Sequence, residues 1–418
     1  ACGFPYLFGD QITSHQGAFI MNELPTKPLS IHQGEIRHLG AHDPNYERHF
    51  RAVSQPIYQT SLFAFSDFDD MANAYAGNPG GPIYARGDNP TVMAFEREIA
   101  RRENTEASRA FASGMGAISA TVMALVAPGD RIVTVHNVYS DAYRLFETML
   151  RPMGVKIDYV DGKDTDAVIA AITDARLLFL ESPTSLTFEL QDLEKLATAA
   201  RANDVITVID NSWATPVFQK PADHGIDLVI HAASKFLSGH SDTVAGVVTG
   251  RQSLIDRINA STFPYLGGKL GPFEAWLLLR GLDTLELRMQ RHALNGEYLA
   301  RNLAVHPQVS SVLYSGFSDH PGSKTLHGHS SLFSIILDDA VDIRAFSNAL
   351  RIFRLGVSWG GPESLVVPAA AVLDQKYDVS AFRHFKLNPQ LVRIYGGLEN
   401  PEDLLADLKQ AIAVGLKR

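Results

Sequence analysis

Short apolar runs alternate with helical patterns through the middle of the chain, and this alternation restricts the fold more than any other feature. Most runs have four to six residues and are rich in Val, Ile and Leu. Such runs are typical of strands buried on both faces, and helices between them predict a mostly parallel sheet covered on both sides. The predicted strands are Arg131–Val135, Val155–Val160, Leu177–Leu180, Val205–Ile209, Leu228–His231 and Val244–Thr249.

The segment Asp192–Arg201 illustrates the intervening helices. Leu193, Leu196 and Ala197 fall on one helical face, and Glu194 stands in the first turn, where the helix dipole favours an acid. The helices would therefore pack an apolar face onto the sheet. Because open parallel sheets bind ligands beyond the carboxyl ends of their strands, we expect the chemistry at that edge.

The pattern changes after Gly281. A long helical stretch, Thr284–Leu303, leads into the alternating segment Ser331–Leu337, and a final helix is predicted from Pro401 to about Leu416. This succession predicts a second, smaller α+β domain.

The chain is accordingly divided into four parts. Residues 1–20 show neither strand nor helix periodicity and are interpreted as an extension, native or artificial. Residues 21–85 are rich in Pro, Gly, His and Asn and are predicted to form an N-terminal arm that contacts a neighbouring subunit. Residues 86–282 would form the large domain and residues 283–418 the C-terminal domain.

Composition excludes several classes of protein. The net charge of −9 argues against general nucleic-acid binding, which needs a basic face. The sequence contains no apolar stretch of membrane-spanning length and no signal-peptide pattern, so we expect no membrane partner. The single cysteine, Cys2, excludes an internal disulfide, which suits the cytoplasm. The sequence has no His-Glu-x-x-His and no tight cluster of His and carboxylates, and His306, His327 and His329 are interpreted as loop residues, so no metal is expected.

Two strand ends carry candidate catalytic side chains. Asp210 directly follows the run Val205–Ile209, and Lys235 follows Leu228–His231 after three small residues. Taken singly, an aspartate there is usually a capping residue and a lysine usually reaches solvent. Together they fit pyridoxal 5'-phosphate (PLP) chemistry, which needs a lysine amine for an imine and a carboxylate beside the pyridine nitrogen.

Three further segments supply groups for anions. Phe111–Ile118 places small residues at the start of a helical pattern, where backbone amides can approach a phosphate. Tyr84–Thr91 supplies Arg86, which can clamp a phosphate bidentately. Arg393 lies inside an apolar, strand-like run, and a buried arginine generally has an anionic partner. That partner would be either a substrate carboxylate or an internal Asp or Glu.

From about residue 45 to the C-terminus these motifs resemble the Cys/Met metabolism family of PLP-dependent enzymes, the γ-family within fold type I. The resemblance implies a PLP-dependent transferase-like α/β fold with a large, seven-stranded, mostly parallel sheet and a smaller α+β domain. It also implies that Lys235 forms the internal aldimine and shuttles protons. The other cofactor residues would be Asp210 at the pyridine nitrogen, Tyr139 stacked on the ring and helping in catalysis, and Gly114, Met115 and Ser234 at the phosphate.

The resemblance also assigns residues to the substrate and to a neighbouring subunit. Arg393 would bind the α-carboxylate of a small amino-acid substrate, with Ser358 and Trp359 beside it. Tyr84 and Arg86 would reach the phosphate of the neighbouring subunit's cofactor. This implies a homo-oligomer, usually a tetramer built from two active dimers.

Within the family, the motifs point to two branches. The segments Phe179–Pro183, Asp210–Trp213, Gly239–Asp242 and Ser358–Leu365 resemble the cystathionine β-lyase branch, and Trp359 is the most specific residue. We therefore expect a lyase that cleaves the Cβ–S bond of cystathionine, or of a related amino acid, to a thiol, pyruvate and ammonia. Tyr84–Thr91 and Ser113–Met115 are closer to the γ-cleaving branch, while Val357 and Pro362 depart from the β-lyase pattern. The alternative is a γ-lyase or γ-replacement enzyme acting on canavanine, methionine or cystathionine.

Two readings from other classes fit less well. A non-enzymatic protein that has kept the fold would be expected to have lost part of the lysine, aspartate and arginine set, and all three are present. A nicotinamide-dependent dehydrogenase would require Gly-x-Gly-x-x-Gly after a strand, and the sequence has none.

Overall fold

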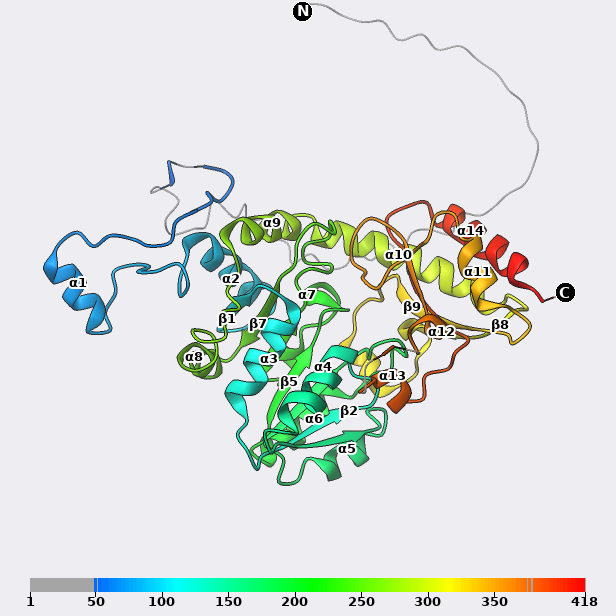
Figure 1. The fold of residues 1–418 in the computed structure, drawn as a ribbon, viewed down its shortest axis with the longest axis horizontal. Coiled ribbons are helices and arrows are strands. Elements are labelled where there is room, and N and C mark those ends of the chain that lie inside the picture. The colour runs from blue at the N-terminus through cyan, green and yellow to red at the C-terminus, as the bar shows by residue number, and fades with distance from the viewer. Residues whose placement is uncertain (1–48, 51, 374, 377–378, 418) are drawn as a thin grey trace, which may run out of the picture.

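The computed structural model describes residues 49–50, 52–373, 375–376 and 379–417. Residues 1–20, predicted to be an extension, and residues 21–48 of the predicted arm lie outside the described residues. The remainder forms two sheets with their helices, and the two sheets lie at opposite ends of the long helix α10 (Figure 1).

The larger sheet has seven strands in the order β1-β7-β6-β5-β4-β2-β3. Strands β3, β2, β4, β5 and β6 pair in parallel, and β7 runs antiparallel to both of its neighbours. This confirms the predicted mostly parallel sheet. The strands are β1 (Ala107–Phe111), β2 (Arg131–Val135), β3 (Lys156–Val160), β4 (Leu177–Glu181), β5 (Ile206–Asp210), β6 (Leu228–His231) and β7 (Gly246–Gly250).

Strand β1 was not among the predicted strands, for a physical reason. It occupies the edge of the sheet, and its sequence, Ala-Ser-Arg-Ala-Phe, has no β-branched residue and carries two polar side chains. An edge strand needs less apolar surface than a central one, so its apolar pattern is weak.

Successive residues of the central strands face two separate hydrophobic layers. Leu177 and Phe179 of β4 pack with α3, α4 and α8, whereas Leu178 and Leu180 pack with α5 and α6. This two-residue alternation buries both faces and explains why the strand reads as a continuous apolar run. The helices of this part are α2 (Pro90–Arg102), α3 (Gly114–Leu125), α4 (Ser140–Leu145), α5 (Thr165–Ala171), α6 (Leu193–Ala202), α7 (Thr215–Phe218), α8 (Gln252–Ala260) and α9 (Pro272–Leu282), with the short helices η3 (Phe146–Leu150) and η4 (Pro221–His224).

The smaller sheet has five strands in the order β10-β11-β12-β9-β8 and is mainly antiparallel. Its apolar face packs with α10, α11 and α14 in a core of its own. The elements are α10 (Leu285–Ala304), β8 (Val309–Leu313), η5 (Ser315–Phe317), η6 (Pro321–Thr325), β9 (Leu332–Leu337), α11 (Ile343–Ala349), β10 (Arg354–Leu355), β11 (Leu365–Pro368), α12 (Ala369–Val372), α13 (Ala381–His384), β12 (Leu391–Tyr395) and α14 (Pro401–Gly415).

The described part of the N-terminal arm stands away from the two sheets (Figure 1). It contains one helix, α1 (Phe68–Tyr75), which the weak amphipathic pattern did not predict. The apolar run at Ser61–Phe65 forms a single β-bridge, between Leu62 and Tyr84, rather than a strand. The predicted boundary at residues 282–283 falls between α9 and α10 and stays a prediction.

Among the described residues, no helix is long and apolar enough to cross a membrane. In the same residues, no group of three or more His, Cys, Asp or Glu side chains is arranged to hold a metal ion.

The smaller domain depends on one buried carboxylate, which yields a stability prediction. Asp407 of α14 accepts hydrogen bonds from the backbone amides of Arg351, Ile352 and Phe353 at 2.7 to 3.1 Å. Asp407→Ala would leave these partly buried amides without their acceptor, so we expect the free energy of unfolding to fall by about 3 kcal/mol. Urea unfolding followed by fluorescence measures the loss.

The matched control is Asp403→Ala on the same helix. Asp403 is exposed in the first turn of α14, and its removal should cost only about 0.5 kcal/mol through the helix dipole. Equal losses for the two variants would contradict the role assigned to Asp407.

Candidate active site

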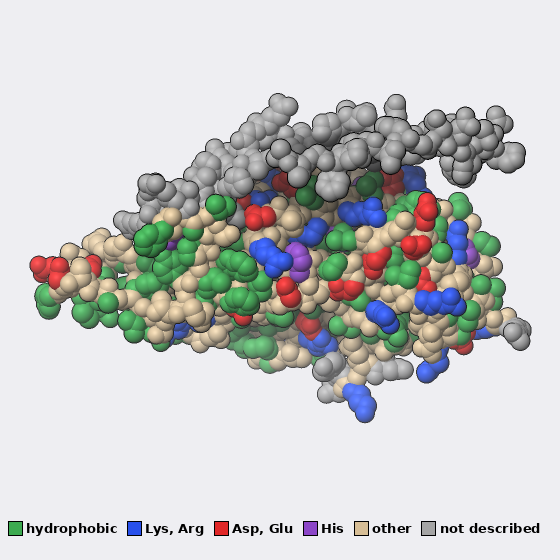
Figure 2. Space-filling view, turned by 90° about the horizontal axis from the view of Figure 1, so that it is seen from above, with side chains coloured by type: hydrophobic (Ala, Val, Ile, Leu, Met, Phe, Trp, Pro, Cys, Tyr) green, Lys and Arg blue, Asp and Glu red, His purple; other side chains and the backbone are tan. Residues whose placement is uncertain are grey.

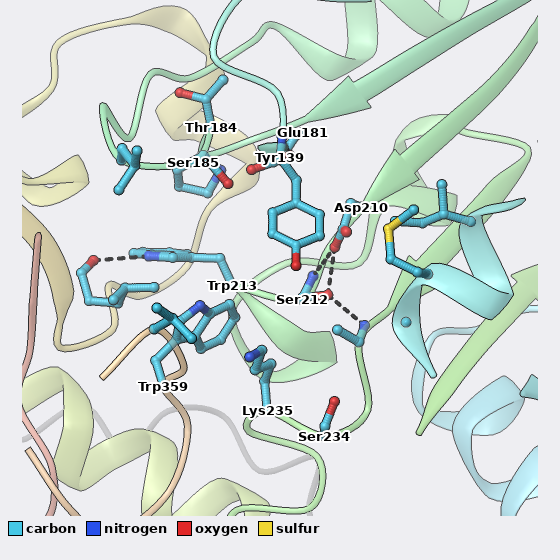
Figure 3. A pocket seen from close by; sticks show the side chains of 18 of the residues that line it. Tyr139, Glu181, Thr184, Ser185, Asp210, Ser212, Trp213, Ser234, Lys235 and Trp359 are labelled. Atoms are coloured by element: carbon cyan, nitrogen blue, oxygen red, sulfur yellow. Dashed lines mark hydrogen bonds between the residues drawn. The ribbon is translucent and has the colours of Figure 1, made fainter. Parts of the chain in front are cut away.

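A cavity of about 250 Å³ lies at the carboxyl edge of the large sheet, where the chemistry was expected. Its walls come from the ends of β4 and β5, the turn after β6, the start of α3 and the loop that carries Trp359 (Figure 3). Arg393 reaches it from β12 of the smaller sheet. The pocket therefore joins the two parts of the fold.

Lys235 lies in the turn that follows β6, and its side chain points into the cavity (Figure 3). Its Nζ donates a hydrogen bond to Ser358 Oγ at 2.7 Å and lies 5.4 Å from the centre of the Trp359 ring. Burial, with a smaller contribution from the Arg393 charge, lowers the pKa of the amine to about 8, and the Asp210 charge opposes the shift. A neutral, nucleophilic amine is therefore accessible near neutral pH.

The backbone around Lys235 is packed closely against the Trp359 loop. Gly360 has a φ of +100°, and a Cβ atom there would lie 2.6 Å from the carbonyl carbon of Lys235. Behind the turn, Arg288 Nη1 donates to Phe236 O at 2.7 Å. These contacts hold the lysine in place from both sides.

Asp210 ends β5 and lines the same pocket. Its Oδ1 accepts hydrogen bonds from the Ser212 backbone amide at 2.9 Å and from the Ser212 hydroxyl at 2.5 Å. The Ser212 hydroxyl in turn accepts from the Ala232 amide at 2.6 Å, so it ties the ends of β5 and β6 together. Burial raises the pKa of Asp210, and the two bonds from Ser212 oppose that shift.

A second carboxylate, Glu181, stands beside Asp210 and was not predicted as a site residue. It ends β4, and its Cα pairs in register with that of Asp210. Burial and the Asp210 charge both raise the pKa of Glu181. The signal was present, because Glu181 follows an apolar run as directly as Asp210 follows the next one.

Glu181 also fixes the position of Tyr139. The backbone amide of Tyr139 donates to Glu181 Oε2 at 2.7 Å, just before α4 begins. The Tyr139 ring faces the cavity beside Asp210, as Figure 3 shows. Burial, with the nearby charges of Asp210 and Glu181, raises the pKa of the phenol.

The start of α3 presents backbone amides that could hold an anion. Ser113 caps this twelve-residue helix by accepting from the Gly116 amide at 2.9 Å, while the amides of Gly114 and Met115 stand in the first turn, where intrahelical acceptors are lacking. A Cβ on Gly114 would lie 2.8 Å from the Ala232 Cβ, so only glycine allows this approach. Ser234, the residue before Lys235, lines the same cavity (Figure 3).

Arg393 is half-buried on β12, and its observed hydrogen-bond partners are neutral. Its Nη2 donates to Val357 O at 2.9 Å and to Ser358 O at 3.1 Å. Burial lowers its pKa to about 10. Its Nε, also buried, has no hydrogen-bond partner among the described residues. Of the two predicted partners of Arg393, the structure favours a substrate carboxylate over an internal Asp or Glu, because the guanidinium contacts only neutral acceptors and keeps one unused donor.

Tyr84 and Arg86 lie apart from the other predicted site residues. Both are exposed, and the Arg86 guanidinium carbon lies 5.4 Å from the centre of the Tyr84 ring. The structure thus brings together Lys235, Asp210, Tyr139, Gly114, Met115, Ser234, Ser358, Trp359 and Arg393, but not these two. That Tyr84 and Arg86 serve a neighbouring subunit stays a prediction.

Comparison with known proteins identifies the family. The sequence model of the Cys/Met metabolism PLP-dependent enzymes matches residues 38–413. The chain therefore belongs to this family of PLP-dependent enzymes, as its motifs predicted.

Individual relatives include several carbon–sulfur lyases. The L-methionine gamma-lyase of Pseudomonas putida is 37% identical over 399 residues, which cover 94% of this chain and 98% of the relative. The cystathionine beta-lyase of Lactococcus lactis subsp. cremoris is 34% identical, covering 86% and 94%. Among solved structures, a cystathionine gamma-lyase from Lactobacillus plantarum superposes with a TM-score of 0.81 at 34% identity, covering 88% of this chain and 95% of that one.

The depressed pKa of Lys235 yields a prediction for the protein freed of PLP. With a pKa of about 8, about half of this amine is neutral at pH 8, against roughly 0.3% for an ordinary lysine. Trace labelling with acetic anhydride, quantified peptide by peptide, should show Lys235 reacting with a midpoint near pH 8.

Lys195 is the internal control, since its side chain is 67% exposed. The Arg393→Ala variant should move the Lys235 midpoint upward, because it removes a positive charge that disfavours the ammonium form. Identical midpoints for Lys235 and Lys195 would show that the pocket does not perturb the amine.

Proposed function

We propose that this chain cleaves the carbon–sulfur bond of a sulfur-containing amino acid, with PLP attached to Lys235. The observation that carries the proposal is the position of the Lys235 amine. It is depressed in pKa, held at 2.7 Å from Ser358 Oγ, and placed between the Asp210 carboxylate and the Arg393 guanidinium in one cavity.

The residues of the pocket fit PLP in size and in chemistry. Lys235 offers the amine, and Asp210 offers the carboxylate that would face the pyridine nitrogen. Tyr139 offers a ring to stack on. The first-turn amides of Gly114 and Met115, with the Ser234 hydroxyl, would hold the phosphate, and the close approach of Gly114 to Ala232 fixes the position of these amides. When bound, PLP draws electrons from the substrate Cα into its protonated ring.

The remaining residues would orient the substrate and move protons. Arg393 would bind the substrate α-carboxylate through its Nε, which has no hydrogen-bond partner among the described residues. Ser358 and Trp359 would lie on either side of that carboxylate. This would set the Cα–H bond toward Lys235 Nζ, the base and proton carrier. The raised pKa of Tyr139 disfavours its predicted role as a base for the incoming amine, so stacking on the cofactor ring is the role that we propose for it. The raised pKa of Glu181 lets that side chain carry a proton beside Asp210, which would limit the negative charge collected there.

Two bonds are candidates for cleavage. Cβ–S cleavage of cystathionine, giving a thiol, pyruvate and ammonia, is supported by the likeness of the Ser358–Leu365 segment to the β-lyase branch and by the relative from Lactococcus lactis that is named a cystathionine beta-lyase. Cleavage at Cγ, as the name of the Pseudomonas putida relative describes for methionine, is supported by the pocket lining. There the exposed side chains of Val244 and Val357 are apolar and suit an uncharged alkyl thiol. Canavanine and γ-replacement belong to the same alternative.

We further propose that the active unit is a dimer, assembled as a tetramer, in which Tyr84 and Arg86 reach the neighbouring cofactor phosphate. In support, hydrophobic side chains gather over the end of the molecule that carries α1 (Figure 2). There Leu62, Phe68 and Tyr75 are 57%, 82% and 73% exposed. Large apolar patches of this kind mark interaction surfaces.

Product analysis distinguishes the two bonds. With cystathionine, β-cleavage gives pyruvate and homocysteine, whereas γ-cleavage gives 2-oxobutanoate and cysteine. With methionine, 2-oxobutanoate and methanethiol would establish the γ-lyase. We expect one of these product sets from the wild-type enzyme, measured by chromatography of the 2-oxo acids.

Lys235→Ala is the control for that assay. It should lower 2-oxo acid formation by at least about 10³-fold, because it removes both the attachment and the base, and it should abolish the visible absorbance of the lysine-bound cofactor. Lys195→Ala should change neither. Retention of activity in the Lys235 variant, or no 2-oxo acid from any sulfur amino acid, would refute the proposed function.

A further inference from the structure

Arg109 is a partly buried arginine that the proposed chemistry does not use. It stands in the middle of the edge strand β1, with 13% of its side chain exposed. Its Nη1 donates to the carbonyl oxygen of Gly87 at 3.1 Å and to Asp88 Oδ1 at 3.2 Å. One guanidinium nitrogen thus holds the segment that directly follows Arg86.

The segment Tyr84–Asp88 is otherwise secured mainly at its beginning. Tyr84 pairs with Leu62 in a β-bridge, and the Ala85 amide donates to Ser61 O at 2.9 Å. Beyond Arg86, the amides of Gly87 and Asp88 both turn back to the carbonyl of Tyr84, at 2.9 and 3.2 Å. The turn therefore presents Arg86 at its apex, and Arg109 ties its second half to the large sheet.

Arg109 is itself held rigidly. Its Nε donates to Asn259 Oδ1 at 2.7 Å, and its guanidinium carbon lies 4.6 Å from the centre of the Phe263 ring. The buried carboxylate of Glu96 approaches Nη1 at 3.6 Å and accepts from the Ala110 amide at 2.8 Å. These contacts fix the orientation of the planar guanidinium. A lysine ammonium, which is a point charge on a flexible stem, could not be oriented in this way.

The charge of Arg109 has a second consequence for the turn. Asp88 lies two residues after Arg86, and its carboxylate would repel a phosphate that Arg86 binds. The ion pair with Arg109 offsets this negative charge. Arg109 would thus both place the turn and neutralise the acid beside it.

From these contacts we propose that Arg109 is a positioning residue for the neighbouring subunit's cofactor, which it serves by fixing the Tyr84–Asp88 turn. The inference rests on the proposed function, since it takes Arg86 to be the group that meets the phosphate. It goes beyond that function because it gives a residue of β1, which does not line the pocket of its own chain, control over PLP affinity in another subunit.

The first test measures PLP affinity. Arg109→Ala should raise the dissociation constant of PLP, titrated by absorbance into the PLP-free oligomer, by about tenfold, as expected for losing charge-assisted hydrogen bonds. Arg109→Lys should recover only part of this, because an ammonium keeps the charge without the fork. The control is Arg131→Ala. Arg131 lies at the start of β2 and pairs with Asp158 of β3, so its loss should leave the affinity for PLP unchanged. Unchanged affinity in Arg109→Ala would overturn the proposal.

The second test asks whether Arg109 acts through Arg86. If it does, Arg86→Ala combined with Arg109→Ala should bind PLP no more weakly than Arg86→Ala alone. Additive losses would show that Arg109 acts by another route and would overturn the proposal. Thermal melting of each variant, compared with that of Arg131→Ala, separates this effect from loss of folding.

The third test uses hybrid dimers, made by co-expressing two differently tagged chains. One chain carries Lys235→Ala and the other carries Arg109→Ala, so the single pocket that keeps Lys235 receives an intact turn from its partner. We expect that pocket to bind PLP with wild-type affinity and to form 2-oxo acid at about half the wild-type rate per dimer, since one of two pockets remains.

A parallel hybrid of Lys235→Ala with Arg86→Ala separates the two possible failures. If this hybrid is restored and the Arg109 hybrid is not, Arg109 acts within its own chain, and the present inference is wrong while the proposed function stands. If neither hybrid is restored, Arg86 does not serve the neighbouring cofactor, and that part of the proposed function fails with it.

Discussion

The site depends on holding two carboxylates and an amine largely away from water at one edge of a parallel sheet. Glu181 and Asp210 end neighbouring strands in register, and Lys235 follows the next strand. Burial disfavours the charged form of each of these groups, so it raises the pKa of both carboxylic acids and lowers the pKa of the amine. For Lys235 the fall from 10.5 to about 8 corresponds to about 3 kcal/mol against the ammonium form.

Close backbone packing keeps these groups in register with the amides at the start of α3. Gly114 approaches Ala232, and Gly246 of β7 approaches the Ser113 carbonyl, which a Cβ would meet at 2.2 Å. Gly360 approaches Lys235 in the same way from the smaller domain. Because no side chain intervenes, α3, the turn after β6 and the Trp359 loop are held in one arrangement. The cavity between them owes its shape to these contacts.

Much of this arrangement could be predicted from the sequence, because buried parallel strands leave continuous apolar runs. Asp210 and Lys235 were found by their places after two such runs. Glu181 occupies the same kind of place but was passed over, since a carboxylate after a strand is usually a cap. The edge strand β1 left no apolar run, and the contacts of Arg109 join segments that lie far apart in the sequence. Contacts of that kind follow from tertiary packing, which local patterns do not encode.

The central claim is a covalent link between PLP and one amine, and chemical trapping tests it most directly. Purified protein would be reduced with borohydride, digested, and its peptides sequenced by mass spectrometry. The account predicts that the added mass of the reduced cofactor lies on the peptide containing Lys235, at that residue alone. Cofactor mass on a different lysine, or none after incubation with PLP, would contradict it.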